Sequence, residues 1–139
     1  MSEGHSLVEF DADALTFRLP SAQPFRVALS DVTRVYQVSA GWDVHANDQE
    51  FWVVDLPDRR VVLPDDAPGV YQAFTSARAQ LASMGRLFSA TCYMPPKAWR
   101  SKRLGLFPSY RVRAAVVPLQ ALTSIVPDWT AATISGETW

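Results

Sequence analysis

Apolar and polar positions alternate with a period of two along most of the chain, which is the pattern of strands that bury one face. Residues 7–19, LVEFDADALTFRL, contain two short alternating runs around the acidic turn 11–13, and this predicts an early hairpin. In PFRVALSDVTRVYQVSA, the alternation over residues 25–38 is interrupted near Ser30 and Asp31. We therefore expect a strand, a corner and a second strand there.

Three later segments are also typical of strands. EFWVVDLP is the most β-like run of the chain, and PDRR reverses the direction into VVLP, so residues 51–56 and 60–63 should form a hairpin. RLFSATCYMPP and YRVRAAVVPLQAL alternate in the same way and predict two further strands. Between them a short helix is expected over 97–104, after Pro96, although so short a helix needs tertiary contacts to form.

One segment, PDDAPGVYQAFTSARAQLASMG, shows the helical period instead. Its apolar stripe recurs at intervals of four, three and four residues and consists of Val70, Phe74, Ala77 and Leu81. Asp65 and Asp66 precede this stripe, where carboxylates favour the positive end of a helix dipole, and Gly85 is a natural C-terminal stop. We expect one main helix over about 68–84 that covers a face of the sheet.

These patterns predict an α+β fold with a mostly antiparallel sheet, strongly twisted or partly barrel-like. The length fits a single domain over 1–139, in which residues 128–139 are expected to form a loose tail. No apolar run approaches the roughly 18 residues that a spanning helix needs, so no membrane contact is expected. The N-terminus shows no secretory signal and Cys92 has no companion cysteine, which together favour a cytoplasmic protein.

Charge is distributed unevenly along a chain whose net charge is only −1. Residues 1–66 carry 12 acidic and 5 basic side chains, residues 67–127 carry 8 basic and no acidic ones, and residues 128–139 carry 2 acidic ones. This polarity indicates a charged partner, unless the sheet interleaves the two parts so that their charges pair. The near-neutral total argues against a dedicated nucleic-acid binder, which is usually basic.

The stretch KAWRSKRLGLFPSYRVR, residues 97–113, has no acidic side chain. Its six cations would meet phosphates in a nucleic-acid complex while aromatic rings stack on bases. Its cationic and aromatic residues are Lys97, Arg100, Lys102, Arg103, Arg111 and Arg113, with Trp99, Phe107 and Tyr110. The alternative is a solvated basic loop whose aromatic residues anchor it to the core, and an acidic protein would suit the same cations.

A second aromatic group lies among acidic residues, around GWDVHANDQEFW. Exposed rings beside carboxylates would suit a basic protein partner, because rings supply contact area and charges steer approach. The group consists of Trp42, Phe51 and Trp52 with Asp43, Asp48 and Glu50. The alternative is that Phe51 and Trp52 point to opposite faces of one strand and pack in the core.

Residues suited to catalysis are few. Cys92 would act as a nucleophile only beside a base, and its place in an alternating strand favours a buried thiol instead. His45 has Asp43, Asp48 and Glu50 near it in sequence, which would suit a cation site, but a polar loop at a hairpin tip has the same composition and we favour the loop. Because there is no glycine-rich phosphate loop and no paired metal-ligand motif, we expect neither a cofactor nor a metal.

FRVALSDVTRVYQV and EFWVVDLPDRRVVLPDDAPGVYQAF, within residues 25–85, resemble small bacterial domains of pleckstrin-homology-like or related α+β build, including immunity proteins of toxin systems. In those domains a strand and an SDVTRV-type corner lead to a hairpin, and an LPDDAPG-type segment starts a helix. The resemblance ends after residue 86, where a pleckstrin-like barrel would be finishing, so it does not imply a closed barrel. It contains no catalytic motif and assigns no site residues.

We therefore expect a non-enzymatic protein-binding protein of immunity or adaptor type, which occludes a partner protein, such as a toxin or effector, sterically and electrostatically. The candidate partner-binding residues are Trp42, Asp43, Asp48, Glu50, Lys97, Trp99, Arg100, Lys102, Arg103 and Tyr110. The alternative is a nucleic-acid-associated domain that binds through residues 97–113. A third hypothesis is an enzyme that uses Cys92 or His45.

Overall fold

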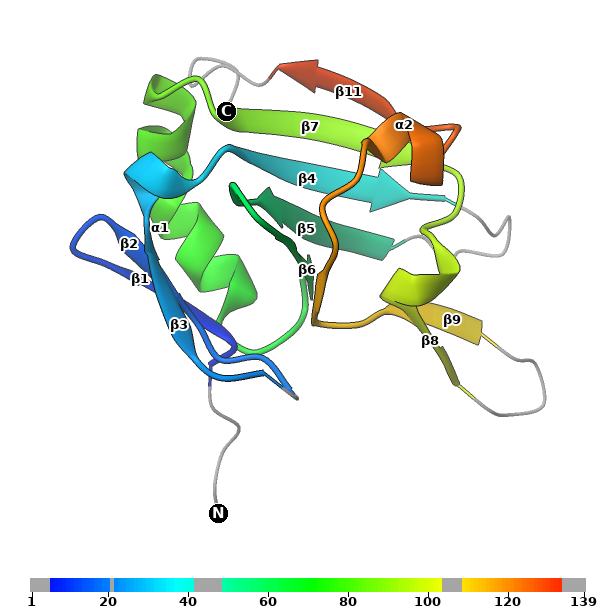
Figure 1. Cartoon of the computed structure of the whole chain (residues 1–139), viewed down its shortest axis with the longest axis horizontal. Coiled ribbons are helices and arrows are strands. Elements are labelled where there is room, and N and C mark those ends of the chain that lie inside the picture. Colours follow the sequence, from blue (N-terminus) through cyan, green and yellow to red (C-terminus); the bar gives the residue numbers. More distant parts are fainter. Residues whose placement is uncertain (1–5, 21, 42–48, 104–108, 134–139) are drawn as a thin grey trace.

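The computed structural model describes residues 6–20, 22–41, 49–103 and 109–133, and at residues 102, 103, 109, 110 and 133 it describes the backbone alone. Figure 1 shows an α+β arrangement of sheets with one main helix. The elements are β1 (Val8–Asp11), β2 (Ala14–Phe17), β3 (Phe25–Ala28), η1 (Leu29–Asp31), β4 (Arg34–Ala40), β5 (Gln49–Asp55), β6 (Arg60–Pro64), α1 (Val70–Ser83), β7 (Leu87–Cys92), η2 (Lys97–Trp99), β8 (Arg100–Arg103), β9 (Ser109–Val112), β10 (Ala115–Val117), α2 (Leu122–Ile125) and β11 (Thr130–Thr133).

A six-stranded sheet in the order β10-β6-β5-β4-β7-β11 forms the centre of the molecule. Neighbouring strands in this sheet are antiparallel, except that β4 and β7 are parallel. The parallel pair is possible because the chain crosses over the sheet through α1 between β6 and β7. The edge strands β10 and β11 do not pair with each other, so the sheet stays open and does not form a barrel. β1, β2 and β3 form a separate antiparallel sheet, and β8 pairs with β9.

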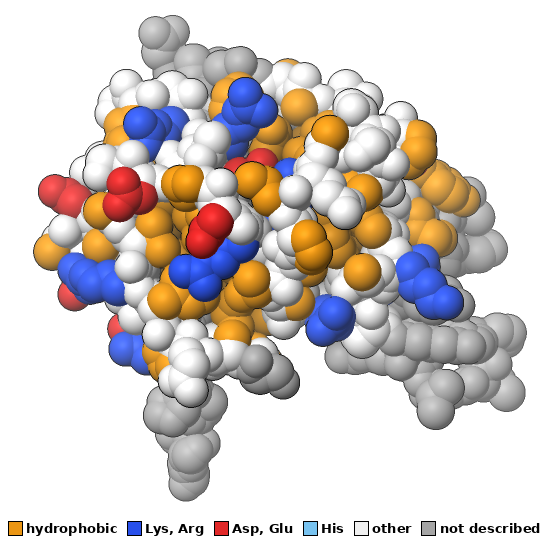
Figure 2. All heavy atoms as spheres, viewed as in Figure 1, with side chains coloured by type: hydrophobic (Ala, Val, Ile, Leu, Met, Phe, Trp, Pro, Cys, Tyr) orange, Lys and Arg blue, Asp and Glu red, His pale blue; other side chains and the backbone are white. Residues whose placement is uncertain are grey.

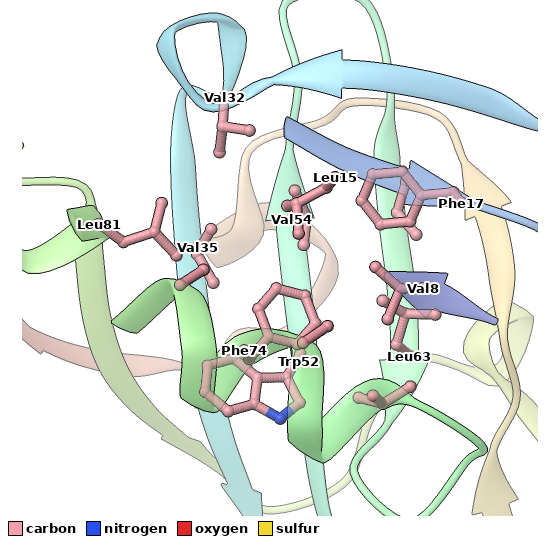
Figure 3. Close-up of a cluster of buried hydrophobic side chains, with 14 of the residues drawn as sticks. Val8, Leu15, Phe17, Val32, Val35, Trp52, Val54, Leu63, Phe74 and Leu81 are labelled. Atoms are coloured by element: carbon pink, nitrogen blue, oxygen red, sulfur yellow. The ribbon is translucent and has the colours of Figure 1, made fainter. Parts of the chain in front are cut away.

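Helix α1 and the small β1–β3 sheet cover one face of the central sheet. Figure 3 shows Phe74 of α1 against Trp52 of β5, with Phe17 of β2 in the same cluster. The rings of Trp52 and Phe74 stack at a centroid distance of 4.5 Å and an interplanar angle of 10°. The alternation expected from the sequence thus supplies the apolar face on which α1 packs.

The opposite face of the sheet carries a second core, built with the C-terminal part of the chain. Phe51 belongs to this core and its neighbour Trp52 to the first, and they are 0% and 2% exposed. The interpretation that these two rings point to opposite faces is therefore confirmed. Trp99 and Trp129 also pack here, against Phe51 and Tyr36 with centroid distances of 6.2 Å and 5.3 Å.

The expected helix and strands are found with small shifts, and two expectations need correction. The helix runs from Val70 to Ser83, inside the expected range 68–84. The short helix expected over 97–104 is wrong, because a single 3-10 turn at Lys97–Trp99 leads directly into strand β8. The loose tail expected over 128–139 is wrong for Thr130–Thr133, which pairs with β7, whereas residues 134–139 lie outside the described residues.

A buried ion pair joins β5 and β6 at the end of their hairpin. Asp55 and Arg60 are 7% and 2% exposed, and Arg60 Nε and Nη2 donate to Asp55 Oδ1 and Oδ2 at 2.6 and 3.2 Å. The two-point geometry compensates part of the cost of removing both charges from water. No helix among the described residues is long and apolar enough to cross a membrane.

Candidate functional site

The acidic and basic segments of the sequence meet at one end of the central sheet, and we call this region the charged junction: residues 49–50, 65–66, 97–103 and 109–113. Gln49, the first residue of β5, accepts a hydrogen bond at Oε1 from the Val112 amide of β9 at 2.8 Å. Asp66, just before α1, accepts from Arg111 Nη2 at 2.7 Å. These two contacts hold the basic hairpin β8–β9 against the start of β5 and against the segment before α1.

The basic hairpin and the residues that flank it contribute cations whose environments differ. Arg113 donates through Nε and Nη2 to the Ala98 carbonyl at 3.2 and 2.8 Å, and Arg100 Nη1 lies 3.1 Å from the Met94 sulfur. Lys97 is exposed and forms no ion pair with any described residue. Figure 2 shows Lys and Arg side chains at the β8–β9 end, while the acidic side chains visible on that face lie toward the other end.

Trp99 does not belong to the exposed surface. It is 2% exposed and packs edge-on against Phe51, so neither a base nor a partner protein can stack on its ring in this structure. Trp99 thus anchors the hairpin to the core, as the alternative interpretation held for the aromatic residues of the basic stretch. We remove Trp99 from the candidate binding residues.

Several predicted site residues lie outside the described parts of the molecule. Trp42, Asp43 and Asp48 fall in the undescribed segment 42–48, together with His45. Lys102 and Tyr110 are opposite each other in the β8–β9 ladder, and Arg103 faces Ser109, but only their backbone is described. These residues remain candidates on sequence grounds alone.

Glu50, in contrast, has a defined place between two hollows of the surface. One hollow of about 210 Å³ is lined by Gln49, Glu50, Asp65, Asp66 and Arg111. The other hollow, of about 330 Å³, lies on the same face of the central sheet as α1, in a polar part that the helix leaves uncovered. Four of its lining residues are neighbours on successive strands, from β11 through β7 and β4 to β5: Thr130, Thr91, Ser39 and Glu50. Among the described residues, Glu50 is the carboxylate that lines both hollows.

Sequence reasoning missed three contributors to this region: Asp65, Gln49 and Tyr93. Asp65 accepts a hydrogen bond from the Trp52 indole at 2.7 Å, and its amide donates to the Glu50 carbonyl at 3.1 Å. Tyr93 is 60% exposed just after β7, and the preceding carbonyl of Cys92 accepts from the Gly41 amide at 3.3 Å. Tyr93 is therefore an exposed ring next in sequence to a residue that is hydrogen-bonded to Gly41, just after β4.

Cys92 is buried in the second core, as its strand position predicted. Burial raises the pKa of its thiol from the ordinary 9.0 to about 12, and the charge of Asp128 adds to this rise. The thiolate that a nucleophilic mechanism requires is therefore scarce at neutral pH. The described residues also contain no group of three or more His, Cys, Asp or Glu side chains placed to hold a metal ion.

Comparisons of the chain with protein-family models, with curated proteins and with solved structures gave no match. The arguments about function therefore come from the charged junction itself.

Proposed function

We propose that this chain is a non-enzymatic protein-binding protein of immunity or adaptor type, which occludes a partner protein through the charged junction. The observation that carries the proposal is the attachment of the β8–β9 hairpin to the start of β5, through Gln49–Val112, and to the segment before α1, through Arg111–Asp66. These contacts present both signs of charge side by side, which suits a protein partner with its own mixed charge pattern. The resemblance of residues 25–85 to immunity proteins makes a toxin or effector the partner class to test first.

The same observation favours a protein over a nucleic acid. A nucleic-acid backbone is uniformly negative, so Glu50, Asp65 and Asp66 beside the hairpin would repel it. Arg111 is already paired with Asp66, and Trp99 is buried and cannot stack on a base. The nucleic-acid alternative is therefore kept as an outcome of the experiment below.

Occlusion would work through two kinds of contact. Charges such as Glu50 and Lys97 would steer the encounter and fix the orientation, and these effects weaken as salt rises. Affinity would come from a few residues that lose water on binding, for which Tyr93 and Trp42 are the candidates. Truncation of at least one of them to alanine should cost more than about 2 kcal/mol of binding free energy if it is a hot spot.

The test is a pull-down from lysate of the source cell with three proteins: the wild type, the junction variant Glu50→Lys/Lys97→Glu, and the control Glu9→Arg/Arg18→Glu. The control reverses a solvent-exposed ion pair between Glu9 of β1 and Arg18, the residue after β2, outside the junction. We expect one protein retained by the wild type and the control and lost by the junction variant.

The retained material decides between the classes of function. A protein that binds all three forms equally, or no protein at all, contradicts the proposal. Nucleic acid retained in a salt-sensitive way by the wild type, without a protein, would replace it with the nucleic-acid alternative.

A further inference from the structure

Strand β11 forms an open edge of the central sheet. It pairs with β7 along all four of its residues, and no described strand lies on its other side. Figure 1 shows β11 at the border of the sheet, and β7 is the only described element that packs extensively on it. In an antiparallel ladder every second residue directs its N–H and C=O away from the paired strand. The outer side of β11 therefore presents backbone donors and acceptors.

The other strand edges in the described part of the chain are protected. The β10 edge lies near η2, where Arg113 donates to the Ala98 carbonyl, and Pro118, which has no amide donor, follows this strand. β1 lies along α1, β3 carries Arg26, and both β8 and β9 carry cations. β11 lacks these devices, because its sequence TAAT has no charge and no proline and its ladder with β7 has no bulge.

The chemistry of this edge selects an extended strand as its occupant, and the absence of charge favours a second copy of the same chain. A row of backbone donors and acceptors is complemented by the backbone of another strand. In a pair of identical strands related by a twofold axis, each charged side chain lies near its own copy, which is destabilising. Thr130, Ala131 and Ala132 are exposed and uncharged, so two copies of β11 avoid this repulsion.

We propose that two copies of this chain associate through β11, antiparallel across a twofold axis, so that their central sheets join into one continuous sheet. This inference goes beyond the proposed function, because the β11 edge lies outside the charged junction. Within each copy, β7 and β4 separate β11 from β5, to which Glu50 of the junction belongs. The two junctions therefore lie on opposite sides of the axis, and the dimer can hold two partner molecules.

Sedimentation equilibrium of the full chain at increasing concentration measures the association. Pairing along four residues covers less than the roughly 1,200 Å² of a stable interface, so we expect a weak dimer with a dissociation constant of roughly 10–500 µM. A wild type that remains monomeric up to about 1 mM would overturn the inference.

Charge-swap variants at Ala132 make the test specific to this edge. Ala132→Lys and Ala132→Glu each bring like charges together across the axis, because opposite and diagonal positions on paired strands lie about 5–8 Å apart. Each variant alone should associate at least tenfold more weakly than the wild type, whereas an equimolar mixture should recover the dimer. This recovery also shows that both variants are folded. Dimers that persist in each variant alone, or a mixture that does not recover, would overturn the inference.

Two controls separate the β11 edge from other surfaces. Val116→Lys places a cation at an exposed position of β10, on the opposite border of the sheet, and should associate as the wild type does. The junction variant Glu50→Lys/Lys97→Glu should also form the dimer, so the proposed function and the β11 pairing fail independently. Loss of association in Val116→Lys would place the contact at β10 and contradict the proposal.

Other occupants of the edge give different results. If the wild type is monomeric but Ala132→Lys loses a protein in the pull-down, the edge receives a strand of a partner protein. If the wild type is monomeric but a chain that ends at Thr133 forms the dimer, residues 134–139 keep the second copy away from the edge. Either result overturns pairing between two full-length copies.

Discussion

The side chain of Arg86 holds the corner between β3 and β4, which the residues of the corner itself do not fully determine. Its Nη1 atom lies within hydrogen-bond distance of the carbonyls of Leu29, Ser30 and Val32, at 3.0, 2.7 and 2.8 Å. These carbonyls belong to the η1 corner between β3 and β4, where a positive charge suits the exposed carbonyl end of a helical turn. The corner was predicted from Ser30 and Asp31, but the residue that holds it comes more than fifty positions later in the chain.

Cys92 gives a prediction at the residue scale, about the dependence of stability on pH. The unfolded thiol ionises near the ordinary pKa of 9.0, whereas burial keeps the folded thiol protonated up to about 12. The stability that this difference contributes is complete below pH 9 and is lost as the pH rises toward 12. Wild-type stability should therefore fall more steeply over this interval than that of Cys92→Ala.

Urea unfolding of both proteins at a series of pH values measures this slope. Lost packing should lower the free energy of unfolding of the alanine variant by the same amount at every pH. Ionisation of the thiol is therefore measured by how the difference in unfolding free energy between the two proteins changes with pH. Parallel stability curves between pH 9 and 12 would show that the Cys92 thiol is not shielded from solvent as its pKa indicates.

Helix α1 is positioned at its start by contacts from outside the helix. Asp65 and Asp66 were expected ahead of the first turn, near the positive end of its dipole, and they do precede it, but neither caps the helix and Gly69 is the N-cap. Asp65 instead accepts from the Trp52 indole and Asp66 from Arg111. The carboxylates before the helix therefore connect it to the sheet and to the basic hairpin.

The two ends of α1 give a matched pair of glycines. Gly69 and Gly85 both have positive φ angles, +80° and +70°. A Cβ at Gly69 would lie 2.6 Å from Ser6 Cβ and 2.8 Å from the Val8 carbonyl oxygen, whereas at Gly85 it would meet nothing within 4 Å. We expect Gly85→Ala to cost about 1–2 kcal/mol from the left-handed conformation alone, and Gly69→Ala to cost clearly more because backbone must also move.

Chemical denaturation of the two variants beside the wild type measures both costs. Each change adds one methyl group at a residue with a positive φ angle. The difference between the two losses of unfolding free energy therefore measures the cost of the contact that the new methyl group at residue 69 makes with β1 and the segment before it. Equal losses would mean that the chain before β1 yields readily and does not fix the start of α1.

Elements whose structure depends on local alternation were predictable from the sequence, and those that depend on distant partners were not. The β5–β6 hairpin follows from its own residues, and its register, with Phe51 opposite Pro64, would also have placed Glu50 beside Asp65. The segment 97–104 looked helical locally, but Trp99 packs into the core and Arg100 pairs with Val112. The junction contacts of Gln49 and Arg111 span 63 and 45 residues, and no local pattern signals them.

At the scale of the whole molecule, both cores are built on one sheet. Neighbouring residues of β5, Phe51 and Trp52, enter different cores, so neither core can form fully without the strand that both share. Helix α1 covers one face and the segment with η2 and α2 the other. This arrangement argues that the described part of the chain unfolds as one cooperative unit.

Two leucines on the covering helices test this cooperativity. Leu81 of α1 lies in the first core at 0% exposure, and Leu122 of α2 lies in the second at 9%. Replacement by alanine should cost about 2–5 kcal/mol at Leu81, and less at Leu122 because its burial is less complete. Each change should nevertheless lower the urea midpoint of both cores equally, since they share the sheet.

Fluorine NMR of protein labelled with fluorotryptophan reports the two cores separately, because Trp52 belongs to the first and Trp99 to the second. In each variant the two resonances should lose their folded signals at the same urea concentration, and at the same concentration as the far-ultraviolet circular dichroism. If Leu122→Ala lowered the midpoint of Trp99 alone, the C-terminal layer would be a separate unit. The basic hairpin, which is anchored by Trp99, could then detach from β5 without global unfolding, and the charged junction would no longer be a preformed surface.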